Sequence, residues 1–94
     1  MANPLAPVTL TANTVSTQTV DDGYETIEVL NMTGSAEVYF RVDGTAPTVG
    51  GAGCYVLPAT IGALEVEALD THGARAHTVK LISPGTPKVS VRGA

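Results

Sequence analysis

The stretch Ala36-Glu-Val-Tyr-Phe-Arg-Val-Asp43 decides the fold class of this chain, because apolar residues alternate in it with polar or amphipathic ones. The period of two places Val38, Phe40 and Val42 on one face of a β-strand, whereas a helix would mix the two sets. We therefore predict a strand over residues 36–43, with these three side chains directed into the core.

Shorter patterns of the same kind recur along the rest of the chain. Val, Ile and Thr are frequent in them, and β-branched side chains suit a pleated strand. Turn sequences such as Asp21-Asp22-Gly23 and Pro84-Gly85 separate the patterns. We expect further strands at residues 8–13, 24–31, 54–57, 64–68, 76–83 and 89–91, and a polar, Thr-rich strand or loop over 15–20.

The same alternation assigns side chains to faces. In the strand at 8–13, one face is expected to carry Val8, Leu10 and Ala12. In the strand at 24–31, we place Ile27 with Val29 on one face, and Glu28 with Asn31 on the other.

These elements predict an all-β domain. About seven short antiparallel strands with frequent turns favour a small two-sheet β-sandwich, immunoglobulin-like (Ig-like) in kind, because a single sheet would leave one apolar face in water. Residues 1–7 contain two prolines and no alternation. We expect them to form an extended N-terminal arm, and residues 8–94 to form a single sandwich domain.

Composition and charge exclude several classes of function. Of the 94 residues, 44% are hydrophobic and 15% charged, which suits one packed domain. The net charge is −4 and the five Lys and Arg residues are scattered, so no basic cluster is present to bind nucleic-acid phosphates. The sequence has no apolar run near membrane-spanning length and no basic region followed by an apolar one at its start, so we expect no membrane span, no signal peptide and synthesis in the cytoplasm.

Two groups of residues could be interpreted either as metal ligands or as turn residues. His72 and His77 fit a turn and an edge strand better than a metal site. Asp21, Asp22 and Asp43 could supply oxygens to calcium, but adjacent Asp residues before a glycine more often form a turn. We predict no metal and no cofactor.

The sequence gives even less support to a catalytic site than to a metal site. Cys54 has no patterned base beside it, so we predict a buried structural thiol rather than a nucleophile. Glu65 and Glu67 are expected on the outer face of a strand with nothing opposing them, whereas acid–base catalysis needs one desolvated carboxyl. We therefore predict that the protein is not an enzyme.

One turn carries a resemblance to a known module. Tyr39, Asp43, Gly44, Pro47 and Thr48 resemble the strand-turn signature of Ig-like modules appended to chitobiase-type glycosidases and bacterial surface proteins. This resemblance implies a sandwich fold and carries no activity with it.

A longer resemblance covers most of the chain. Residues 31–51, 55–59 and 79–91 resemble small virion proteins of tailed phages that infect actinobacteria. The resemblance implies a capsid decoration or minor head protein, located in the virion. It also implies the major capsid protein and neighbouring copies of this chain as partners, in a homo-oligomer or a lattice.

The arm at 2–7, the glycine-rich loop at 49–53 and the tail at 89–94 could serve as contact surfaces for such partners. The alternative for each segment is disorder or a plain surface connection. The candidate interface residues are Pro4, Leu5, Pro7, Tyr39, Arg41, Val49 and Tyr55, with Tyr24 as a further aromatic candidate. The alternative is a tail- or fibre-associated Ig-like module for adhesion or carbohydrate binding. Sugar platforms use surface aromatics, and this chain has no Trp and three Tyr.

Overall fold

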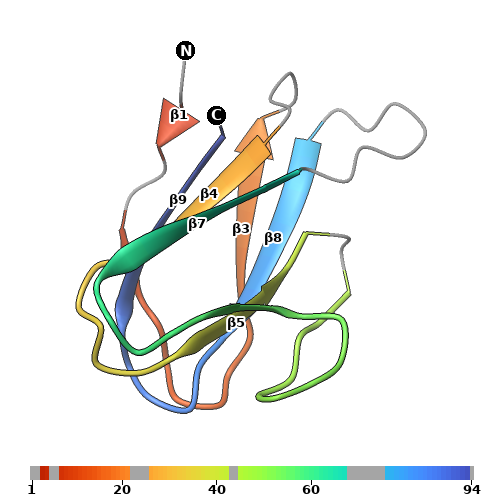
Figure 1. The fold of residues 1–94 in the computed structure, drawn as a ribbon. Helices are drawn as coiled ribbons and strands as arrows, with labels where there is room; N and C mark the ends of the chain where they lie inside the picture. Colours follow the sequence, from red (N-terminus) through yellow and green to blue (C-terminus); the bar gives the residue numbers. More distant parts are fainter. Residues whose placement is uncertain (1–2, 5–6, 22–25, 43–44, 68–75, 94) are drawn as a thin grey trace.

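The computed structural model describes residues 3–4, 7–21, 26–42, 45–67 and 76–93. These residues form two antiparallel sheets that face each other across a shared core (Figure 1). The described part of the chain contains no helix. The predicted all-β, two-sheet sandwich is therefore confirmed.

The first sheet has the strand order β1-β9-β4-β7, and a further short strand, β2, also pairs with β9. Its strands are β1 (Asn3–Pro4), β2 (Val8–Thr9), β4 (Thr26–Asn31), β7 (Gly62–Glu67) and β9 (Lys88–Gly93). The second sheet has the order β3-β8-β5-β6. Its strands are β3 (Ser16–Asp21), β5 (Val38–Arg41), β6 (Tyr55–Leu57) and β8 (Ala76–Ile82).

The core lies between the inner faces of the two sheets. Val38, Phe40 and Val42 are buried, which confirms the face predicted from their alternation. Fully burying side chains of this size stabilises a domain by about 1.5–3 kcal/mol each, before the entropy of ordering them is subtracted. The other core residues are Leu10, Val20, Ile27, Val29, Leu57, Val66, Val79, Leu81, Val89 and Val91.

Asn31 corrects one of the face predictions. It has the same parity as Ile27 and Val29 in β4, and it is buried with them rather than exposed with Glu28. Its amide is fully used there, because Nδ2 donates to the carbonyl oxygens of two other segments and Oδ1 accepts a backbone N–H. A polar side chain can occupy an inner-face position when hydrogen bonds compensate its desolvation.

The predicted strand at 8–13 is also corrected. Pairing with β9 stops at Thr9, although Leu10 still enters the core and its backbone N–H donates to the Pro87 carbonyl oxygen at 2.9 Å. Ala12 is exposed, so it does not share the buried face. The chain turns at Asn13, which has a φ of 56° in the left-handed region that Asn tolerates.

The two ends of the chain meet in the first sheet. Asn3 and Pro4 pair with Gly93 and Arg92, so part of the predicted arm lies on the protein's own sheet. The predicted tail at 89–94 is mostly β9, which is hydrogen-bonded between the N-terminal strands and β4. Residues 88–93 are therefore an element of the sheet rather than a free tail, and their role as a contact surface stays a prediction.

Candidate interaction surface

β5 presents alternate residues to solvent on the outer face of the second sheet. Tyr39 and Arg41 are half-buried there, between the neighbouring strands β8 and β6. Tyr39 lies opposite Val56 on one side and Ile82 on the other, and its hydroxyl is 3.5 Å from a carboxylate oxygen of Glu37. An aromatic ring flanked by aliphatic side chains gives this face an amphipathic centre.

Arg41 joins the sheet to the loop that precedes β6. It lies opposite Lys80 in the register of β5 and β8, and its Nη1 donates to the Ala52 carbonyl oxygen at 3.1 Å. Within the loop, the Gly51 N–H donates to the Thr48 carbonyl oxygen at 2.9 Å. These contacts hold the loop against β5, and they leave Val49 exposed.

β6 forms the edge of the second sheet. Tyr55 lies opposite Phe40, and the two ring centroids are 5.4 Å apart with a tilt of 33°. Tyr55 therefore extends the core aromatic to the surface, where it remains 38% exposed. Val56 is 49% exposed beside Tyr39.

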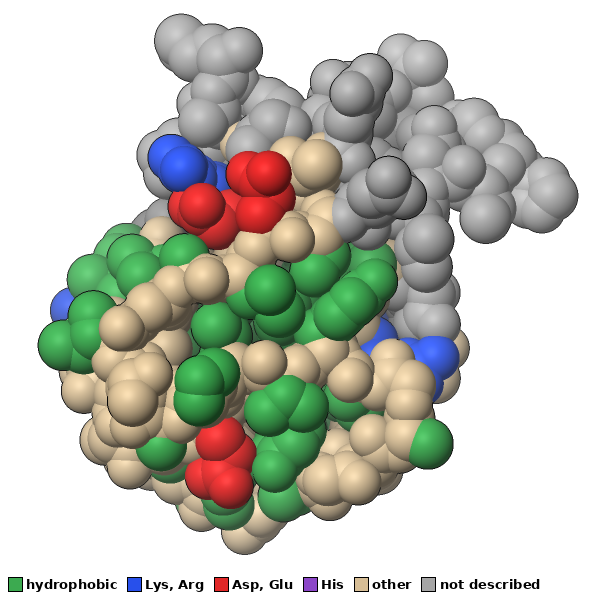
Figure 2. Space-filling model, in the orientation of Figure 1, with side chains coloured by type: hydrophobic (Ala, Val, Ile, Leu, Met, Phe, Trp, Pro, Cys, Tyr) green, Lys and Arg blue, Asp and Glu red, His purple; other side chains and the backbone are tan. Residues whose placement is uncertain are grey.

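The structure thus brings three of the candidate interface residues together. Tyr39 and Arg41 lie on the outer face of β5, and Val49 lies in the loop that Arg41 contacts. Tyr55 is on the adjacent strand β6, but it lies opposite Phe40 and therefore on the other face of the sheet. We call Tyr39, Arg41 and Val49, together with the outer-face residue Val56, the β6-side surface. The face of the whole molecule seen in Figure 2, on which no single residue is marked, has hydrophobic side chains across its centre and acidic groups above and below them.

Of the remaining candidates, only Pro7 has a described side chain, and it does not join this surface. Pro7 is exposed next to β2, in the first sheet. Pro4 lies in β1, although its side chain is outside the described part of the structure. Leu5 and Tyr24 lie outside the described residues altogether.

Sequence reasoning did not select Val56 or Ile61, which are 49% and 73% exposed. A signal for them is present, because residues 45–64 contain no Asp, Glu, Lys or Arg in a chain with fourteen such residues (9 + 5). Both exposed aliphatic residues fall inside this uncharged segment.

Cys54 precedes β6 and is half-buried, so the prediction of a buried thiol is wrong. Its Sγ is 3.8 Å from the Thr48 carbonyl oxygen, a weak hydrogen bond that ties the strand to the loop. The loop in front of β6 is uncharged and only partly covers the thiol.

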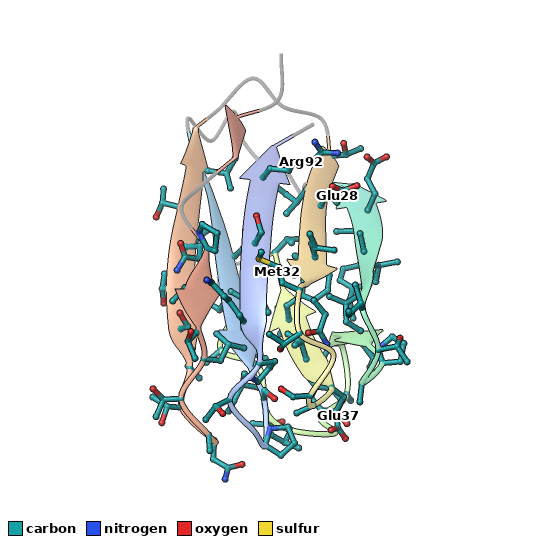
Figure 3. All side chains as sticks on the ribbon, turned by 90° about the vertical axis from the view of Figure 1, so that its left-hand side faces the viewer. Glu28, Met32, Glu37 and Arg92 are labelled. Atoms are coloured by element: carbon teal, nitrogen blue, oxygen red, sulfur yellow. The ribbon has the colours of Figure 1, made fainter. Side chains whose placement is uncertain are left out.

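A charged row crosses the outer face of the first sheet. Arg92 Nε is 2.6 Å from Glu28 Oε1, and the two side chains point toward each other in Figure 3. Glu28 lies opposite Glu65 on its other side, which corrects the expectation that nothing opposes Glu65. Glu65 is exposed, and Arg92 compensates only one of the two facing carboxylates.

Most of the residues considered as metal or calcium ligands lie outside the part of the chain that the structure describes. Asp22, Asp43 and His72 are not described, and neither are the side chains of Asp21 and His77. Among the residues that are described, no group of three or more His, Cys, Asp or Glu could hold a metal ion. The same part of the chain has no helix of the length and hydrophobicity needed to cross a membrane.

Comparisons with known proteins give no relative: no family model matches the chain, and neither the curated proteins nor the solved structures contain a significant match.

Proposed function

We propose that this protein is a non-enzymatic structural component of a bacteriophage virion, bound to the outer surface of the head as a capsid decoration protein. Its partners are the major capsid protein and neighbouring copies of itself. The β6-side surface is the observation that carries the proposal, together with the sequence resemblance to phage virion proteins.

The β6-side surface has the composition of a contact site. Tyr and Arg are enriched where proteins bind one another, and Tyr39 and Arg41 lie side by side on one strand there. Val49 and Val56 add aliphatic area that water solvates poorly. A small rigid sandwich with one such surface suits repeated docking on a capsid lattice.

The direct test is mass spectrometry of purified particles of the phage whose genome encodes this chain. A decoration protein is expected at hundreds of copies per head, on the order of one per capsid subunit or per hexamer. A handful of copies would contradict decoration and indicate a tail or vertex protein. Complete absence from intact particles would overturn the virion role.

A binding assay tests the surface itself. The variant Val49→Asp places a charge on the β6-side surface, and we expect at least about tenfold weaker binding to particles that lack the protein. Val15→Asp is the matched control, because Val15 is similarly exposed (38%, against 41% for Val49) and directly precedes β3, the opposite edge of the same sheet. Equal binding by the two variants would show that the β6-side surface is not the capsid contact.

A further inference from the structure

The edge strand β6 differs in composition from the two longer sheet edges, β3 and β7. An edge strand leaves half of its backbone N–H and C=O groups without a partner in the sheet, and proteins usually protect such edges with charge, proline or very short pairing. β7 carries Glu65 and Glu67, and β3 is built from Ser, Thr, Gln and Asp around a single Val. The opposite edge of the first sheet consists of the two-residue strands β1 and β2.

β6 has none of the charged or polar protection seen at the two longer edges. Its three residues are Tyr55, Val56 and Leu57, and it lies in the middle of the uncharged segment 45–64. Most of that segment is accessible to solvent. The residues in it that are not fully exposed are Pro47, Gly51, Cys54, Leu57, Gly62 and Leu64.

We infer that β6 is a self-association edge, at which a second copy of this chain pairs antiparallel and joins the two four-stranded sheets into one. A two-fold axis perpendicular to the sheet passes beside Val56, so that Val56 of one copy lies opposite Val56 of the other. Tyr55 then lies opposite Leu57 of the second copy. The inference concerns the chain's own assembly and does not depend on the virion role.

Charge favours a second copy over a charged partner. In a two-fold interface, each group near the axis meets its own equivalent, so any charge there would face the same charge. The chain carries a net charge of −4, and two copies repel each other over most of their surface. The uncharged segment is where two copies can approach without that repulsion.

The exposed area around β6 is also consistent with a second copy of the chain as the partner. A stable interface buries about 800 Å² on each partner, which is roughly a sixth of the 4907 Å² that the molecule exposes. The segment 45–64 makes up about a fifth of the chain and is largely exposed. β6 has only three residues before Pro58, so the ladder is short and the exposed side chains of β6 itself, Tyr55 and Val56, must contribute most of the contact.

Pairing about this axis has a geometric consequence. Antiparallel joining at an edge keeps the same face of both sheets on the same side. Tyr39 and Arg41 of the two copies therefore lie on one side of the joined sheet, where the dimer presents two equal surfaces in parallel.

Sedimentation velocity of the intact chain tests the inference. We expect a concentration-dependent dimer of twice the 9.6 kDa monomer mass over about 10–500 µM. Val56→Lys and Val56→Glu should each be monomeric, because like charges would face each other across the axis. A one-to-one mixture of the two variants should recover the dimer, because Lys then faces Glu.

The control is Thr19→Lys on β3, the other edge strand of the same sheet, where Thr19 is exposed and lies opposite Thr78. This variant should remain dimeric. A wild-type chain that stays monomeric at the highest concentration would overturn the inference, and it would do so even if the Val56 variants failed to fold. Monomers in the mixture of folded Val56 variants would overturn the proposed register.

Discussion

Asn31 is the residue whose side chain holds the loops at one end of the sandwich. Its Nδ2 donates to the carbonyl oxygens of Ala36 at 2.9 Å and Pro58 at 3.2 Å, and its Oδ1 accepts from the Gly34 N–H at 3.0 Å. Asn31→Ala would leave these three backbone groups without their partner, and we expect a loss of about 3 kcal/mol in the free energy of unfolding. Urea denaturation followed by circular dichroism measures it.

The control for Asn31 is Thr14→Ala. Thr14 Oγ1 also donates to a backbone carbonyl, that of Ala12 at 3.2 Å, but the bond is exposed to solvent. Its removal should change the free energy of unfolding by less than about 0.5 kcal/mol. Equal effects from the two substitutions would show that burial of the Asn31 amide contributes nothing.

Gly34 occupies a position that no other residue fits well. Its φ is +65°, and a Cβ there would lie 2.7 Å from the Ile61 nitrogen and 2.8 Å from the Thr60 carbonyl carbon, both backbone atoms. Gly34→Ala should therefore cost at least about 3 kcal/mol, from left-handed strain plus displacement of the turn before β7. Thermal and urea unfolding of the variant measure the loss.

A substitution at Gly50 distinguishes the cost of left-handed strain from the cost of a steric clash with the backbone. Its φ is +72°, but a Cβ there has nothing within 4 Å. Gly50→Ala should cost only the conformational strain, about 1 kcal/mol. If Gly34→Ala cost no more than Gly50→Ala, the close approach of the Ile61 backbone would not limit that turn.

At the level of elements, the sequence predicts a strand well when one face is apolar throughout. The pattern predicts β5 with its inward face because Val38, Phe40 and Val42 are all apolar. It leaves β3 undecided between strand and loop because the inner positions of β3 include the polar Ser16 and Gln18. The prediction for Asn31 is wrong because its polar side chain suggests exposure, whereas its position in the alternation puts it on the buried face. The backbone partners that allow its burial lie 3, 5 and 27 residues away, and alternation within the strand contains none of them.

The sequence predicts individual residues of the interaction surface, but it does not predict which of them lie together. Chemistry alone selects Tyr39, Arg41, Val49 and Tyr55 as candidates. The pairing of β5 with β6 then places Val56 beside Tyr39, and it puts Tyr55 on the other face with Phe40. That pairing depends on which strands share a sheet, which alternation within a strand does not determine. Nothing in the local sequence distinguishes Val56 from a core residue, but at a sheet edge its side chain is 49% exposed.

The charged row across β9, β4 and β7 gives a prediction about these three strands. Arg92 pairs with Glu28, and Glu28 also faces Glu65. Arg92→Ala leaves two carboxylates opposite each other, and we expect a loss of about 1 kcal/mol at low salt because the pair is partly exposed, with side-chain exposures of 44% and 24%. Unfolding in low and high salt measures it, and salt near 1 M should remove most of the effect.

A double variant identifies the cause of that loss. Glu65→Gln in the Arg92→Ala background should restore about half of the stability, because it removes the facing carboxylate. Lys88→Ala is the control on the same strand, since Lys88 is exposed and lies opposite Thr9. A loss that is independent of salt would indicate that Arg92 stabilises β9 through packing of its aliphatic stem rather than through charge.

At the scale of the whole molecule, the N-terminal segment closes one edge of the first sheet against β9. β1 contributes two residue pairs to that edge, whereas the chain just after β2 contributes Leu10, which is 1% exposed in the core. Deleting residues 1–7 should therefore cost only about 1 kcal/mol in lost backbone pairing. Deleting residues 1–10 removes β2 and Leu10 together, and we expect a further loss of about 3 kcal/mol from the cavity that Leu10 leaves.

Urea unfolding of the two truncated chains distinguishes these contributions. The shorter deletion should keep a cooperative transition with a slightly lower midpoint, and the longer one should lower the midpoint strongly. Leu10→Ala in the full chain should reproduce most of the difference between them, because it removes the same core side chain without shortening the sheet. If deletion of residues 1–7 were as costly as deletion of residues 1–10, the ladder between β1 and β9 would be the main link between the N-terminal segment and the sandwich, and Leu10 would be secondary.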